Sequence, residues 1–145
     1  MTAHLDASGN VKLTALLPAK SRVDVSAGGP GVDTSHFEGV GAAHLVAQPT
    51  NQGAYTIVLQ HAVEDEDASY EDIQVPDPAN PGATVDLAFA QITSSTPADT
   101  EEVLPIDFNK VRRFVRAKPV PTGTPTAVFS VVLAAPVAFG PVEYA

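Results

Sequence analysis

Carboxylate side chains cluster once in the sequence, between Glu64 and Asp72. Closely spaced acids can form a calcium loop of the EF-hand type, which needs oxygen ligands at alternating positions, a Gly at the sixth and a bidentate acid at the twelfth. Counted from Asp65, these two positions are Tyr70 and Pro76, so the motif fails. An acidic, solvated hairpin loop is the favoured interpretation, and incidental binding of a divalent ion by the turn is the alternative.

The histidines and hydroxyl groups show no catalytic spacing either. Zinc-site motifs such as H-x-E and H-E-x-x-H are missing around His4, His36, His44 and His61. Asp33, Ser35 and His36 are close in sequence, but no G-x-S-x-G elbow is present. Residues 28–31, Gly-Gly-Pro-Gly, lack the Lys-Ser/Thr of a phosphate-binding loop. We therefore predict no enzymatic activity, no catalytic residues, no cofactor and no metal ligands.

Composition narrows the classes of protein further. The chain has 145 residues, enough for one domain with its own core, and it contains no Cys, which excludes disulfides and thiolate metal sites. There are 17 Asp and Glu against 8 Lys and Arg, a net charge of −9, so nucleic acid is not expected as a partner. Neither a secretory signal nor an apolar run of membrane-spanning length is visible, and we expect no membrane partner.

The basic residues are segregated from the acidic ones. No Lys or Arg occurs between Val23 and Asn109, a stretch that holds 15 of the 17 acids. In one interpretation, the basic segment 110–118 lies beside the acidic loop of the same chain, and in the other it faces an acidic surface of a neighbouring subunit. On the second interpretation, with the apolar C-terminal residues added, we predict that the interface contains Arg112, Arg113, Arg116, Lys118, Phe139 and Tyr144.

Alternating apolar residues predict the elements that must position these side chains. The pattern has a period of two in residues 54–61, 84–89 and 111–117, and residues 127–134 are apolar throughout, which is typical of a strand buried on both faces. Weaker strand candidates are residues 11–17, 22–26, 39–47, 71–75 and 103–106. Turn sequences rich in Pro and Gly separate these segments. We therefore predict an all-β fold, a β-sandwich of the jelly-roll or immunoglobulin-like kind.

The ends of the chain stand apart from this domain in the sequence. We expect an extended N-terminal arm over residues 1–20, a β-sandwich over residues 21–135 and an apolar C-terminal tail over residues 136–145. Apolar extended ends either pack on their own domain or dock on a neighbouring subunit. Both possibilities remain open from the sequence.

Several short motifs follow one another in a fixed order. They are residues 17–20 (Leu-Pro-Ala-Lys), Val32-Asp33 followed by Phe37-Glu38, residues 58–60 followed by an acidic turn, the basic strand 110–117 and the apolar strand 127–133. This order resembles that of small virion proteins of tailed bacteriophages. The resemblance covers roughly residues 17–135. This sequence departs from the pattern in its acidic turn, which lacks the usual Gly and has Tyr70 at the aromatic position, and in its longer ends.

The resemblance implies a structural role and supplies no catalytic residues. We expect a capsid decoration, or cement, protein on the exterior of the virion, assembled in the host cytoplasm as a homotrimer that contacts the major capsid protein. The alternatives are the base or fibre of a head spike, a head–tail joining component, and a carbohydrate-binding β-sandwich. The last needs an exposed aromatic platform, which a chain with three Tyr and no Trp supplies poorly.

Overall fold

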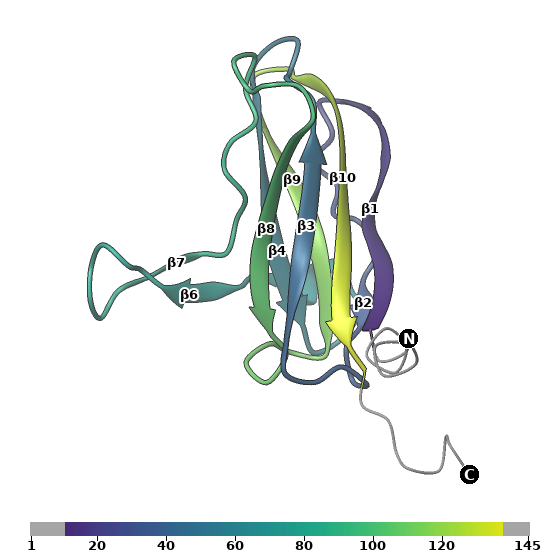
Figure 1. Cartoon of the computed structure of the whole chain (residues 1–145), viewed down its shortest axis with the longest axis vertical. Helices are drawn as coiled ribbons and strands as arrows, with labels where there is room; N and C mark the ends of the chain where they lie inside the picture. Colours follow the sequence, from purple (N-terminus) through teal and green to yellow (C-terminus); the bar gives the residue numbers. More distant parts are fainter. Residues whose placement is uncertain (1–10, 138–145) are drawn as a thin grey trace, which may run out of the picture.

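Two antiparallel sheets lie face to face in the computed structural model, which describes residues 11–137 (Figure 1). The first sheet has the order β1-β10-β3-β8, with bounds Val11–Val23, Thr126–Pro136, Val40–Ala47 and Thr100–Asp107. The second has the order β2-β9-β4-β5, with bounds Val32–Asp33, Phe114–Thr122, Ala54–Ala62 and Glu71–Asp72. The predicted all-β sandwich is confirmed.

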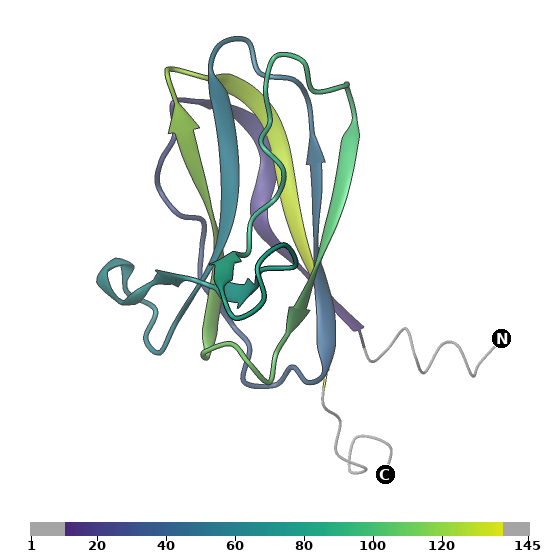
Figure 2. The same ribbon diagram turned by 90° about the vertical axis from the view of Figure 1, so that its left-hand side faces the viewer.

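A separate hairpin projects from the sandwich on the side away from β1 (Figure 1), and Figure 2 shows it turned toward the viewer. It consists of β6 (Gln74–Pro76) and β7 (Thr84–Asp86). The alternation in residues 84–89 predicts that Val85, Leu87 and Phe89 face the core, but Val85 lies in this hairpin and is 39% exposed. Leu87 and Phe89 are buried as predicted, because the chain returns to β4 through backbone hydrogen bonds from Leu59 to Leu87 and from Phe89 to Ile57.

Alternating side chains of the two sheets meet between them and form the core. Phe129, Val131 and Leu133 of β10 are almost completely buried, and the ring of Phe129 packs edge-on against Tyr55 of β4 with centroids 5.1 Å apart. The Tyr55 hydroxyl accepts a hydrogen bond from the Val25 amide at 3.0 Å, so this buried ring also has its polar end satisfied.

Residues 11–20 are part of the sandwich and not of an arm. They belong to β1, which pairs with β10 through partners such as Leu13 and Ala134, and the side chains of Leu16 and Leu17 are buried. The expected boundary at residue 20 is corrected, because apolar burial and a full strand ladder hold this segment to the domain. Residues 1–10 of the expected arm and 138–145 of the expected tail, with Phe139 and Tyr144, lie outside the described residues.

The basic strand also begins later than predicted. Residues 111–113 precede β9, which starts at Phe114 and continues to Thr122. The shift arises because Arg112 and Arg113 sit in the connection from β8, where the Arg113 carbonyl accepts hydrogen bonds from the amide and hydroxyl of Thr34. The basic residues therefore divide between a turn and a strand.

Candidate functional site

Arg116 of β9 is the most buried of the predicted interface residues within the described chain, with 7% of its surface exposed. Its Nε donates a hydrogen bond to Gln60 Oε1 at 2.9 Å, and its Nη1 contacts Asp67 Oδ1 at 2.5 Å. The guanidinium lies over the ring of Tyr70, 4.0 Å from the centroid. Arg116 therefore holds the acidic loop against the solvent side of the second sheet, over β9 and β4.

Tyr70 anchors the other side of the same loop. Its hydroxyl donates to Asp65 Oδ1 at 2.6 Å, and burial together with this hydrogen bond raises the pKa of Tyr70 above its usual value. Gly28 and Gly31 pack so closely that an added Cβ would lie 2.6 Å from the Arg116 guanidinium and 2.1 Å from the Tyr70 hydroxyl, respectively. These glycines thus permit close packing over the loop.

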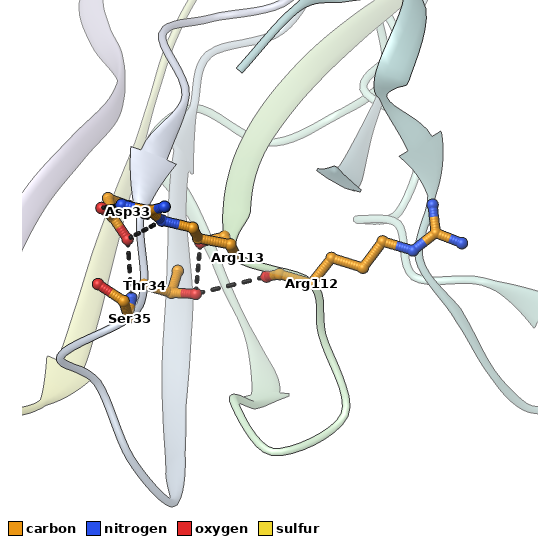
Figure 3. Close-up of polar contacts among 5 residues, drawn as sticks. All are labelled: Asp33, Thr34, Ser35, Arg112 and Arg113. Atoms are coloured by element: carbon orange, nitrogen blue, oxygen red, sulfur yellow. Dashed lines mark hydrogen bonds and ion pairs between the residues drawn. The ribbon is translucent and has the colours of Figure 1, made fainter. Parts of the chain in front are cut away.

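Arg113 holds a neighbouring turn in place, as Figure 3 shows. Its Nη2 lies 2.9 Å from Asp33 Oδ2, and its Nε lies 3.3 Å from both carboxylate oxygens. The hydrogen bond from Arg113, together with one from the Ser35 amide at 2.9 Å, holds the pKa of Asp33 well below its usual value. The Val-Asp turn identified in the sequence is therefore fixed by the basic segment of the same chain.

Arg112 points the opposite way from Arg113 in Figure 3 and pairs with Glu71 of β5. Its Nη1 lies 2.9 Å from Glu71 Oε2, and its backbone amide donates to His61 Nδ1 at 3.2 Å. Partial burial, and to a smaller extent the charge of Arg112, lower the pKa of His61. His61 therefore serves as a neutral hydrogen-bond acceptor at this corner.

The three arginines of the predicted interface thus all pair with acids of their own chain. This is the arrangement of the first interpretation, in which the basic segment lies beside the acidic loop. Arg116 is buried in the contact between β9 and the acidic loop, so it is not available to another subunit. Arg112 and Arg113 keep 43% and 59% of their side chains exposed and Lys118 is half-buried, so their contact with another subunit stays a prediction.

The sequence analysis missed the most uniform surface, the solvent side of the first sheet. This surface, the outer face, consists of odd-numbered residues 11–15 of β1, even-numbered residues of β10 and β3, and odd-numbered residues 101–107 of β8. The strand register aligns it into rows across the sheet, of which two are Leu13-Ala134-Ala42-Pro105 and Ala15-Val132-His44-Val103. Both rows are mostly apolar.

One sequence signal pointed to this surface. Residues 127–134 were predicted to be buried on both faces, yet in the single chain Val128 is 43% exposed and Val132 and Ala134 are only half-buried. The expectation of two-sided burial is wrong for the isolated chain, because the second side faces solvent. A strand with this composition is typical of one whose second side is also covered.

A smaller apolar cleft lies where the β6–β7 hairpin joins the sandwich. Its volume is about 260 Å³, and Ile73, Val75, Leu87, Pro105 and Ile106 contribute to its wall. Asp107 and Lys110 are its charged lining residues. The cleft offers space for an apolar group but assembles no set of catalytic side chains.

Comparison with protein-family models and with curated protein sequences gives no match for this chain. Among residues 11–137, no three His, Asp or Glu side chains are close enough together to hold a metal ion. The same part of the chain contains no helix long and apolar enough to cross a membrane.

Proposed function

We propose that this protein is a structural subunit of a tailed-phage virion that decorates and stabilises the capsid through contacts with the major capsid protein. The observation that carries the proposal is the outer face, a four-stranded and mostly apolar surface that indicates a subunit of an assembly in a chain with a net charge of −9. Exposed apolar surfaces of this extent are typical of protein–protein contacts. The resemblance in motif order supplies the class of particle.

A decoration protein acts by mass action. A subunit that binds only the assembled shell stabilises it by about 2.7 kcal/mol per site when its free concentration is a hundred times its Kd. Such a function requires a rigid domain with interaction surfaces and no catalytic group. That requirement is met by the sandwich, by the acidic loop that Arg116 holds in place and by the projecting β6–β7 hairpin.

The proposal is tested by adding the purified protein to heads that lack it. We expect it to sediment with the heads at saturable stoichiometry and to raise the temperature at which they open. Bovine serum albumin at equal concentration is the control for trapping and crowding. Heads that bind none of the protein, or that open at the same temperature after binding it, would refute the decoration role.

The alternatives receive less support from the described residues. A carbohydrate-binding site would need an exposed aromatic platform, but Tyr55 and Tyr70 are buried, and no Phe within residues 11–137 is fully exposed. A head-spike base or a head–tail joining component would share the sandwich and would differ in location. The position of the protein in the particle, and the number of copies in its ring, distinguish these two roles from decoration.

A further inference from the structure

The outer face is large enough to be a subunit interface. Its four strands are spaced by about 4.8 Å and run for about eight residues of 3.3 Å each, a footprint of roughly 500 Å². Two such faces in contact bury about 1,000 Å², the lower limit for a specific interface. Among its large hydrophobic residues, Leu13, Val40 and Val103 are the most exposed, at 69%, 59% and 57%.

Charge is almost absent from this face. It contains no Lys or Arg, and its acids, Glu101 and Asp107, both lie on the edge strand β8. The imidazole of His44 contacts Glu101 at 3.2 Å. Two copies of a chain with a net charge of −9 repel each other, and the outer face is where they can approach without bringing most of their acids together.

We propose that the outer face packs against the outer face of a second copy of this chain. The inference rests on the proposed function only in requiring that the protein works as assembled copies. Antiparallel sheets pack face to face about 10 Å apart with their strands within about 30° of parallel. This geometry pairs copies two by two, in place of the trimer that the sequence resemblance implies.

The acids of the outer face select the orientation. With the two-fold axis parallel to the strands, β8 of each copy lies over β1 of the other, whereas an axis across the strands would place β8 over β8. Glu101 and Asp107 both lie on β8, so the second orientation would bring the face acids of the two copies together. The first orientation keeps these acids apart, and it places Leu13 over Pro105 of the second copy, because both lie in one row.

The first test measures the mass of the purified full chain by sedimentation equilibrium. We expect about 30 kDa, twice the 15.0 kDa of one chain. Leu13→Lys and Val103→Lys should each weaken association at least tenfold, although each reduces the net negative charge. Val63→Lys is the matched control, because Val63 is 65% exposed and follows β4, outside the outer face. Circular dichroism verifies that each variant is folded.

The second test depends on neither stability nor charge. The chain has no Cys, so Leu13→Cys with Pro105→Cys provides two unique thiols, which lie three strands apart, about 14 Å, within one copy. A bismaleimide shorter than that distance should link two copies. The matched control pair, Val63→Cys with Pro105→Cys, should give no linked dimer.

A mass of 15 or 45 kDa, or equal weakening by Val63→Lys, would overturn the inference. So would absence of cross-linking between residues 13 and 105. These measurements use the free protein, so they are independent of head binding. Paired copies that do not bind heads would refute the decoration role alone, and head binding by a protein that stays monomeric would refute the pairing alone.

Discussion

At the residue scale, the charged side chains of the basic segment hold neighbouring loops in place. Arg116 is buried on Tyr70 and bonded to Gln60, whereas Arg113 is bonded to Asp33 with much of its side chain in solvent. The sequence showed both groups of charges but not which strand register would join them. That register depends on long-range pairing of β4 with β9, which residue spacing does not encode.

Replacing Arg116 should therefore destabilise the domain more than replacing Arg113. We expect Arg116→Met to lower the free energy of unfolding by about 1–3 kcal/mol, because it removes a buried hydrogen bond to Gln60 and the contact with the Tyr70 ring. Arg113→Met should cost less than about 1 kcal/mol, since exposed ion pairs contribute little. Urea denaturation measures both, and equal losses would contradict the role assigned to Arg116.

His61 should titrate below its ordinary range. Its pKa is lowered from 6.5 by burial and by Arg112, so its neutral form is favoured in the folded protein. The resulting stability is fully present above pH 6.5 and is lost as the pH falls through the folded pKa. NMR titration of the imidazole measures that pKa, with His61→Asn used to assign the signal. A value of 6.5 or higher would contradict this environment.

At the element scale, alternation predicted the central strands well and the edges poorly. Residues 54–61 and 127–134 fall within β4 and β10, because long apolar patterns dominate where both neighbours are strands. The short segment 84–89 divides between the hairpin strand β7 and the return to the core. The apolar alternation is the same in both parts, so the sequence does not show where the hairpin ends. That point is set by the hydrogen bonds to β4.

Strand β1 provides a direct test of the corrected domain boundary. Leu16 is completely buried, so Leu16→Ala should lower the free energy of unfolding by about 2–4 kcal/mol through lost contacts and a residual cavity. Val23→Ala on the same strand should cost much less, because Val23 is 65% exposed. Thermal and urea unfolding give both values. If Leu16→Ala left the free energy of unfolding unchanged, residues 11–20 would be an arm and not part of the domain.

At the scale of the whole molecule, the net charge of −9 conceals an uneven distribution. The acids lie mainly on loops and on the β8 edge, the three arginines of the basic segment are paired with acids of the same chain, and the outer face is nearly uncharged. The sequence predicted subunit contacts through the basic segment and the apolar C-terminal residues. It could not locate the outer face, because adjacent strands in the sheet are distant in sequence.

The central claim, that the protein coats a phage capsid, is tested most directly by imaging the particle. Cryo-electron microscopy of heads with and without the protein should show a difference density on the outer surface, repeated with the symmetry of the shell and matching the sandwich with its projecting hairpin. Density confined to the tail vertex or to a single spike, or no difference between the two particles, would contradict the claim.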